Sequence, residues 1–130
     1  MYLLDTNSCV ALLNNNRKVE LRFSREFPQC YTSTLVIAEL YKGAYGSQQV
    51  ERNLKNVRSF SELLTVEVFD RAAAEEFGKI QAELKQLARP TGAMDSLIAA
   101  VARSRGSTVV TNNIRDFENI PGLRLEDWIA

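Results

Sequence analysis

The stretch that decides the fold is Met1-Tyr2-Leu3-Leu4-Asp5-Thr6-Asn7 at the start of the chain. Tyr2, Leu3 and Leu4 make a short apolar run, which a carboxylate and two polar residues end abruptly. This pattern is typical of a buried strand that carries Asp5 at its carboxyl end. In open α/β sheets, ligands bind in the crevice outside the carboxyl ends of parallel strands. We therefore expect Asp5 to lie at the mouth of a ligand site.

Strand and helix patterns alternate along the rest of the chain. Further strands are expected near 30–33, 65–69, 108–111 and 123–125. Helices are expected over about 7–14, 17–27, 35–45, 48–63, 71–88 and 94–105, and a turn through Asp116-Phe117. Right-handed crossovers place such helices on both faces of a parallel sheet. The pattern predicts a three-layer α/β/α sandwich with a central, mostly parallel sheet of about five strands.

Length and composition describe an ordinary globular chain. Its 130 residues suit one domain, 1–130, and the 45% apolar and 25% charged residues are average values. No apolar run approaches the roughly 18 residues of a membrane-spanning helix, and the N-terminus lacks the basic region of a secretory signal. We expect a cytoplasmic protein without a membrane partner. The formal net charge of zero excludes a polycation that binds nucleic acid by charge alone.

The chain contains no histidine. This absence excludes a Ser-His or Cys-His nucleophile pair, a histidine general base and a histidine-containing zinc site. Cys9 and Cys30 lack C-x-x-C spacing and stand among apolar neighbours, so we interpret them as buried thiols in a reducing compartment. Any hydrolysis must therefore activate water by other means.

Four acidic residues interrupt apolar sequence near the ends of expected elements: Asp5, Glu39, Asp95 and Asp116. Asp95 has an alternative role as the N-cap of its helix, and Asp116 has one as a turn residue. Glu39 lies in an apolar helical stretch, where an ionised side chain is rarely buried without a partner. Because a doubly wound sheet gathers element ends at one edge, we expect these carboxylates to meet there.

A hard divalent cation would compensate such a cluster, since Mg²⁺ and Mn²⁺ prefer oxygen ligands. Metal held by carboxylates activates water and stabilises the leaving oxygen of a phosphodiester, which requires no histidine. Without metal, clustered acids repel and raise one another's pKa values. We therefore predict that Asp5→Asn raises the melting temperature in metal-free buffer and abolishes activity.

The same residues resemble the PIN-domain ribonucleases, and among them the VapC-like toxins of type II toxin–antitoxin pairs. The resemblance covers essentially the whole chain and rests on four stretches in order. These are Leu3-Leu4-Asp5-Thr6-Asn7, Thr34 with Glu39-Leu40-Tyr41-Lys42-Gly43, Gly92-Ala93-Met94-Asp95-Ser96-Leu97-Ile98-Ala99-Ala100, and Thr111-Asn112-Asn113-Ile114-Arg115-Asp116-Phe117, which continues to Ile120-Pro121-Gly122-Leu123 and Trp128. Ser8-Cys9, where family members often have aliphatic residues, and the loop Arg89-Pro90-Thr91 depart from the pattern without removing an acid.

The resemblance implies a PIN-like fold and Mg²⁺- or Mn²⁺-dependent endoribonuclease activity on RNA. It implies that Asp5, Glu39, Asp95 and Asp116 are catalytic residues and metal ligands, with Asp5 and Asp95 the most direct. It assigns supporting polar roles, orienting acids or water, to Thr6, Asn7, Thr111 and Asn112. It also implies a VapB-like antitoxin that blocks the site, for which we hypothesise an inserted Arg or Lys, and a homodimer.

The sequence is also compatible with two alternative functions. A different phosphoryl-transfer enzyme with divalent metal is possible, although a nucleophilic-aspartate phosphatase would want a second acid where Asn7 stands. A non-cleaving PIN-like scaffold that binds RNA or protein is the other.

Overall fold

The computed structural model describes all residues from 1 to 130. Its centre is a five-stranded sheet in the order β3-β2-β1-β4-β5, and every neighbouring pair is parallel. The strands are β1 (Tyr2–Leu4), β2 (Cys30–Ser33), β3 (Thr65–Glu67), β4 (Thr108–Val110) and β5 (Arg124–Glu126). The predicted fold class, with a mostly parallel sheet of about five strands, is confirmed.

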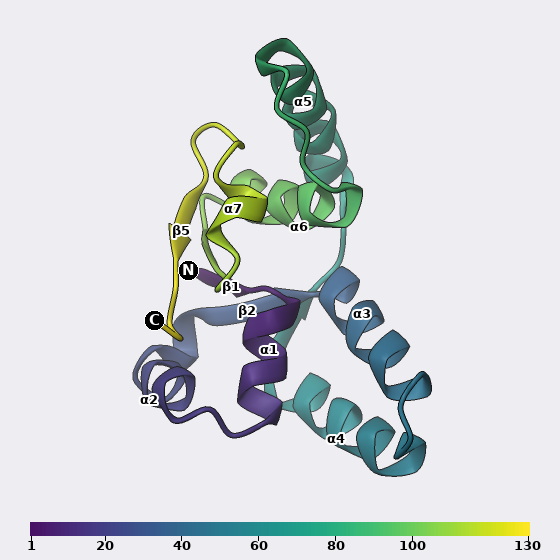
Figure 1. Cartoon of the computed structure of the whole chain (residues 1–130). Helices are drawn as coiled ribbons and strands as arrows, with labels where there is room; N and C mark the ends of the chain where they lie inside the picture. Colours follow the sequence, from purple (N-terminus) through teal and green to yellow (C-terminus); the bar gives the residue numbers. More distant parts are fainter.

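Helices cover both faces of this sheet (Figure 1). On one face lie α1 (Thr6–Leu13), α2 (Arg17–Glu26), the 3-10 turn η1 (Phe27–Gln29), α3 (Thr34–Tyr45) and α4 (Val50–Leu63). On the other lie α5 (Arg71–Leu87), α6 (Ala93–Ser104) and α7 (Ile114–Phe117). The side changes because the chain builds the sheet outward from β1 to β3 and then crosses back to add β4 on the other side of β1. None of these helices has the length and apolar content that would let it cross a bilayer.

The strand order reverses between β1 and β4, so the crevice outside their carboxyl ends is the switch point of the sheet. In doubly wound folds this crevice is the usual place for a ligand. Leu4 pairs with Val110, so Asp5 and Thr111 are the first residues beyond the paired strands. The opening heptapeptide therefore ends where the topology predicts a site.

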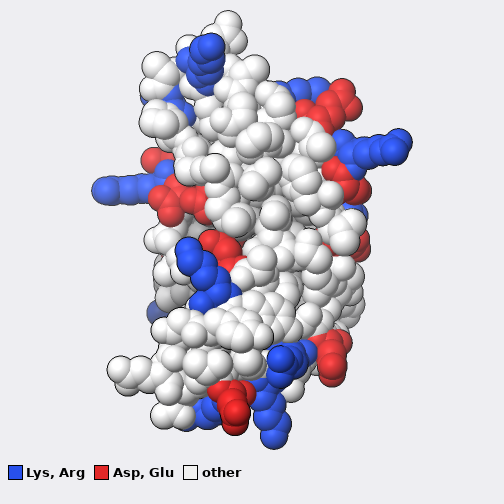
Figure 2. Space-filling model, turned by 90° about the vertical axis from the view of Figure 1, so that its right-hand side faces the viewer, with Lys and Arg blue, Asp and Glu red and all other residues white.

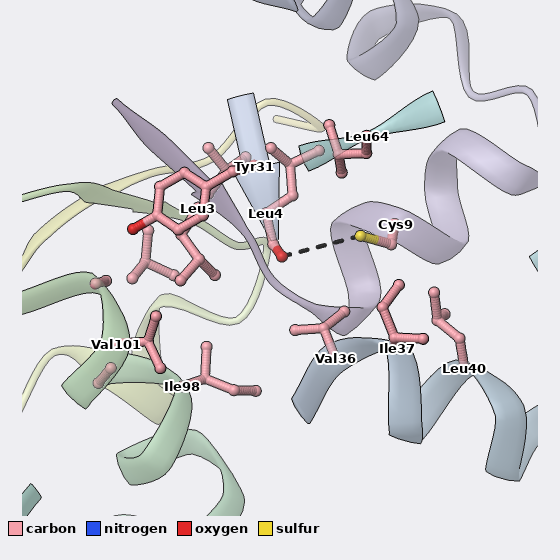
Figure 3. Packing of buried hydrophobic residues seen from close by; sticks show 14 of the residues in the cluster. Leu3, Leu4, Cys9, Tyr31, Val36, Ile37, Leu40, Leu64, Ile98 and Val101 are labelled. Atoms are coloured by element: carbon pink, nitrogen blue, oxygen red, sulfur yellow. Dashed lines mark hydrogen bonds between the residues drawn. The ribbon is translucent and has the colours of Figure 1, made fainter. Parts of the chain in front are cut away.

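The hydrophobic core lies on both sides of β1. Leu3 and Leu4 are both fully buried, and their side chains leave opposite faces of the strand because side chains alternate along it. Figure 3 shows Ile98 and Val101 of α6 on one side, and Cys9 of α1 with Val36, Ile37 and Leu40 of α3 on the other. Burying each leucine stabilises the fold by roughly 1.5–3 kcal/mol. The strand that carries Asp5 is thus held rigidly.

Helix starts follow the polar residues at strand ends. The Asp5 carboxylate accepts a hydrogen bond from the Ser8 amide at 2.9 Å and caps α1, which begins one residue earlier than expected. Ser33 caps α3, and its hydroxyl oxygen accepts from the Val36 amide at 3.4 Å. The expected turn through Asp116-Phe117 is instead the short helix α7, which buries Phe117 beside α6. Burial of this aromatic ring explains why the chain coils there.

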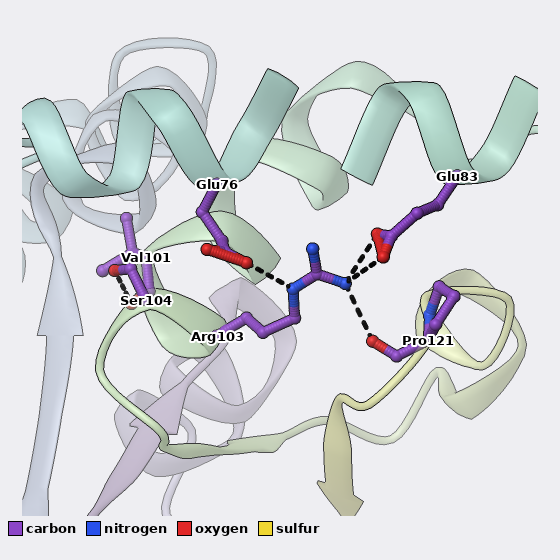
Figure 4. A network of polar contacts seen from close by, with 6 residues as sticks. All are labelled: Glu76, Glu83, Val101, Arg103, Ser104 and Pro121. Carbon is purple, nitrogen blue, oxygen red and sulfur yellow. Dashed lines mark hydrogen bonds and ion pairs between the residues drawn. The ribbon is translucent and has the colours of Figure 1, made fainter. Parts of the chain in front are cut away.

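An arginine joins three segments behind α6. The Arg103 guanidinium donates to Glu76 at 2.9 Å and Glu83 at 2.8 Å, both on α5, and to the Pro121 carbonyl at 2.9 Å (Figure 4). The Arg103 side chain is only 14% exposed and that of Glu76 20%, so the charge-assisted bond between them is partly shielded from water. The Arg103 hydrogen bonds fix α5 and the segment before β5 onto α6, whose first turn carries Asp95.

Candidate active site

Asp5 is anchored where β1 ends. Its amide donates to the Val110 carbonyl at 3.1 Å, and the residue is 5% exposed. The Ser8 hydroxyl donates to the same carbonyl at 2.9 Å, which ties the first turn of α1 to the end of β4. With one carboxylate oxygen occupied by the Ser8 amide, the acid is held in place.

Glu39 comes from the middle of α3 and is half-buried. The Thr6 hydroxyl donates a short hydrogen bond to its carboxylate. This bond connects α1 to α3 across the site, beside Asp5. It is the partner that an acid in an apolar helical stretch requires.

Asp95 lies in the first turn of α6, and Asp116 lies in α7. The N-cap of α6 is Gly92, and no side chain caps this helix, so Asp95 is free of the capping role. A Cβ atom on Gly92 would stand 3.7 Å from the Asp95 Oδ2 atom. Asp116 is exposed and Asp95 is half-buried. The two acids reach the switch-point crevice from the opposite face of the sheet to Glu39.

All four acids line one small cavity of about 130 Å³. The lining residues are Asp5, Thr6, Asn7, Glu39, Asp95, Ile98, Asn113, Asp116 and Phe117. No lysine or arginine is among them. Segments far apart in sequence therefore bring carboxylates to one place without bringing a compensating cation.

The acids affect one another's ionisation. The pKa of Asp95 is raised to about 6, first by burial and then by the charges of Asp116, Glu39 and Asp5. Burial also raises the pKa of Asp5, with a smaller contribution from Glu39, while hydrogen bonds from Thr111 and Ser8 oppose the rise. The ionised form of each acid is disfavoured for two reasons: its carboxylate is poorly hydrated, and other negative charges lie near it.

The polar residues expected beside the acids fall into two groups. Thr6 and Asn7 line the cavity, and Thr111 is buried directly after β4, where its side chain lowers the pKa of Asp5 against the effect of burial. Asn112 is exposed and is not among the lining residues, whereas its neighbour Asn113 is. The Asn113 amide donates to the Thr111 hydroxyl at 2.9 Å, and this turn brings Asn113 to the cavity.

Sequence reasoning missed two residues here, Asn113 and Ser8. A Thr-x-Asn sequence directly after a strand favours a turn in which the hydroxyl accepts from the second amide. That signal would have favoured Asn113 over Asn112. Ser8 had no comparable signal, because its bond to Val110 joins positions 102 residues apart.

The chemistry of the lining residues fits a hard divalent cation. They offer carboxylate, hydroxyl and amide oxygens and no soft ligand, which is the donor set that Mg²⁺ and Mn²⁺ prefer. In their present positions no three acidic side chains form a ready ligand group for one ion. The cavity therefore offers the right ligands, and closing them around an ion requires side-chain movement.

Comparisons with known proteins agree with this architecture. Residues 2–123 match the PIN domain model. The chain is 43% identical over 128 residues to the tRNA(fMet)-specific endonuclease VapC of Shigella flexneri and 38% identical over 130 residues to ribonuclease VapC2 of Haemophilus influenzae strain Rd. These alignments span 98% of this chain with 97% of the Shigella protein and 98% of the Haemophilus protein.

A solved structure extends the agreement to three dimensions. The crystal structure of DNA-bound VapBC from Salmonella typhimurium superposes with a TM-score of 0.93 at 42% identity, covering 98% of this chain and 97% of that one. A match at this identity over nearly the full length of both chains shows more than a shared fold. The chain belongs to the PIN-domain family and, within it, to the VapC ribonucleases.

Proposed function

We propose that this chain is a metal-dependent endoribonuclease that acts as the toxin of a toxin–antitoxin pair. One observation carries the proposal: four carboxylates from four separate segments line a single cavity at the switch point, with no basic side chain among them. Such a cavity suits hydrolysis of a phosphodiester in a chain without histidine. We infer that residues 1–130 form a single PIN domain with this one centre.

In this proposal Asp5 and Asp95 are the most direct ligands of Mg²⁺ or Mn²⁺, and Glu39 and Asp116 complete the acidic set. The bound ion would lower the pKa of a water molecule and stabilise the oxygen that leaves the phosphate. Thr6 holds Glu39 through its hydroxyl, the Ser8 amide orients Asp5, and we assign Thr111, buried directly after β4, a supporting role beside Asp5. Asn7 and Asn113 present amides at the rim, where they can orient water or the sugar–phosphate chain.

The protein has no large basic surface that could bind the negative phosphates of RNA. Figure 2 views the side to which the carboxyl ends of the strands point; charges of both signs are scattered over it, and neither forms a continuous patch. The chain is neutral overall. Counterion release would thus contribute little to RNA affinity, which makes a bridge from metal to phosphate the main source of binding.

A protein antitoxin and a second copy of the chain are the proposed protein partners. The Salmonella relative was crystallised as a VapBC assembly, which supports a VapB-like antitoxin here. Tyr45 at the end of α3 and Leu63 at the end of α4 are 63% and 58% exposed, and each offers an apolar side chain to an antitoxin or to a second copy of the chain. The free thiols of Cys9 and Cys30 support a reducing, cytoplasmic setting.

The test is cleavage of RNA by the purified chain. Total RNA is incubated with the wild type in Mg²⁺, in Mn²⁺ and in EDTA, and the cut ends are mapped. We expect discrete cuts with either ion and none in EDTA. Asp95→Asn is the variant that should lose activity, and Glu51→Gln, an exposed acid in the first turn of α4, is the matched control that should keep it.

The same samples test metal binding directly. Saturation with Mg²⁺ at about 100 times its dissociation constant should stabilise the wild type by about 2.7 kcal/mol, and the melting temperature should rise accordingly. Asp95→Asn should gain much less. Cleavage in EDTA equal to that in Mg²⁺ would refute the metal-dependent mechanism, and RNA binding without any cleavage would favour the non-cleaving scaffold.

A further inference from the structure

A second cavity opens beside the acidic one, between α1, α3 and α4. It has a volume of about 250 Å³, and its walls include Thr6 and Glu39, which also line the acidic cavity. The other lining residues are Val10, Leu13, Asn14, Leu40, Gly43, Ala44, Asn53, Asn56 and Val57. The two cavities are therefore neighbours that share a wall. Whatever enters the second cavity lies next to the acids.

The lining has the character of a site for a flat, uncharged, hydrogen-bonding group. Aliphatic side chains make its floor, and three asparagine amides, Asn14, Asn53 and Asn56, add neutral donors and acceptors. Glu39 is its only charged residue, and it stands on the shared wall, already bonded to Thr6. A phosphate would find no cation here, whereas a nucleobase would find an apolar floor and amides at its edge.

Hydrogen bonds fix the orientation of the Asn53 side-chain amide. The Asn53 Nδ2 group donates to the Ser47 hydroxyl at 2.9 Å, and that hydroxyl donates to the Ala44 carbonyl at 2.7 Å. This relay fixes the Asn53 amide plane between α3 and α4. Its carbonyl oxygen and second N–H stay free for a ligand, since the amide has no other bond within the chain.

A glycine supplies part of the volume. Gly43 lies within α3, where glycine is less stable than alanine, and its backbone has no positive φ that would demand glycine. A Cβ atom built at Gly43 would meet nothing within 4 Å. Gly43 lines the cavity, and a Cβ atom there would meet no clash, so a side chain added at this position starts from open space at the cavity wall.

We propose that this cavity, named here the α1–α3–α4 pocket, binds a single unpaired nucleobase of the RNA next to the scissile phosphate. The inference rests on the proposed nuclease function and adds a source of sequence preference to it. Amides recognise bases through paired donors and acceptors at the base edge, and unpaired bases of single-stranded RNA are available to enter such pockets. The base would select the cut position while the acids carry out the chemistry.

The test uses Gly43→Leu, which fills the pocket, and Gly78→Leu as the matched control. Gly78 also lies inside a helix, α5, and has open space where its Cβ would be, but it is remote from both cavities. Short unstructured RNAs with each of the four bases, or an abasic residue, on either side of the mapped cut are cleaved in Mg²⁺ under single-turnover conditions. Asn53→Leu is a second variant, chosen to remove the held amide.

We expect the wild type and Gly78→Leu to discriminate at least about tenfold among bases at one flanking position. Gly43→Leu should cleave the RNAs with the four different bases at nearly equal rates, and these rates should equal its rate on the abasic RNA. Asn53→Leu should change which base is preferred. Melting curves for each variant identify any that fails to fold.

The outcomes separate the two proposals. If the wild type cuts RNA and Gly43→Leu keeps the full base preference, the pocket is not a base site and the nuclease proposal stands. If Gly43→Leu cuts with unchanged preference but loses inhibition by the co-expressed antitoxin, the occupant is a protein segment and the inference is overturned. If the folded wild type cuts nothing in Mg²⁺ or Mn²⁺, the proposed function fails and the base site falls with it.

Discussion

Replacing Asp95 by asparagine should stabilise the protein in metal-free buffer. Asp95 is the acid whose ionisation is opposed by burial and then by Asp116, Glu39 and Asp5, which raise its pKa from 3.8 to about 6. Above that pH the folded chain carries an unfavourable charge that asparagine lacks. The substitution Asp95→Asn would retain the shape of the side chain without the charge.

The magnitude follows from the pKa shift. A rise of about two pKa units corresponds to about 3 kcal/mol at pH 8, where the side chain of Asp95 is ionised in both the folded and the unfolded chain. Asp95 is only half-buried, so water screens its repulsion with the neighbouring acids. We therefore expect Asp95→Asn to stabilise the fold by about 1 kcal/mol. For a chain of this length, that gain raises the melting temperature by about 4 °C.

The sign of the pH dependence is specific. A folded-state pKa above the unfolded value means that the folded protein binds the proton more tightly. The stabilising contribution of protonated Asp95 is complete below pH 3.8 and is lost as the pH rises through about 6. The advantage of Asp95→Asn should therefore be full at pH 8, smaller at pH 5, and absent near pH 4.

The assay is thermal unfolding in EDTA at these three pH values, followed by circular dichroism. Glu51→Gln is the control, since it removes an exposed carboxylate from the first turn of α4 and so loses the same kind of helix-dipole interaction that Asp95→Asn loses in the first turn of α6. A melting temperature of Asp95→Asn at or below that of Glu51→Gln at pH 8 would show that the acids do not repel, and the reasoning would be refuted.

Three further predictions concern Asp5, the pair Arg103 and Arg105, and the two cysteines. Asp5→Asn should keep α1 capped, because asparagine caps as well as aspartate, and should raise the melting temperature in EDTA while abolishing RNA cleavage; a lower melting temperature would contradict this. Arg103→Ala should lower the free energy of unfolding, measured in urea, by about 2 kcal/mol. Arg105 is more exposed, so Arg105→Ala should lower it by less than about 1 kcal/mol, and equal losses would contradict the role of burial. Burial raises the pKa of Cys9 and raises that of Cys30 to about 12, so both thiols should resist a disulfide reagent at pH 8 until urea unfolds the chain, and rapid labelling of the native protein would contradict this.

Local sequence was sufficient for much of the fold. The apolar run Leu3-Leu4 before Asp5 predicted a buried strand, and the structure confirms β1 there with both leucines inside. The expected helix over 71–88 is present as α5, capped by Asp70. Such features are recoverable because strand burial and helix capping depend on residues within one or two turns of one another. The α7 region was missed because a four-residue helix has no period to detect.

The sequence predicted the four acids as site residues from their positions near the ends of expected strands and helices. Only the tertiary structure brings them close together. Asp5 and Asp95 are separated by ninety positions, and only the crossover that places β4 beside β1 brings their segments to one cavity. The raised pKa of Asp95 likewise depends on burial by packed elements and then on the charges of acids from three other segments. No local pattern encodes such a field, because it arises only after the helices have packed.

The sequence by itself determined which side chains are available for chemistry in this protein: carboxylates without histidine, the basis on which we propose that a divalent cation supports phosphodiester hydrolysis. Only the tertiary structure decided where that chemistry sits and what lies beside it. Asn113 rather than Asn112 faces the acids because of one turn, and the α1–α3–α4 pocket exists because three helices leave Gly43 facing open space. Side-chain identity is a local property, whereas a cavity is the space left by distant segments after they pack.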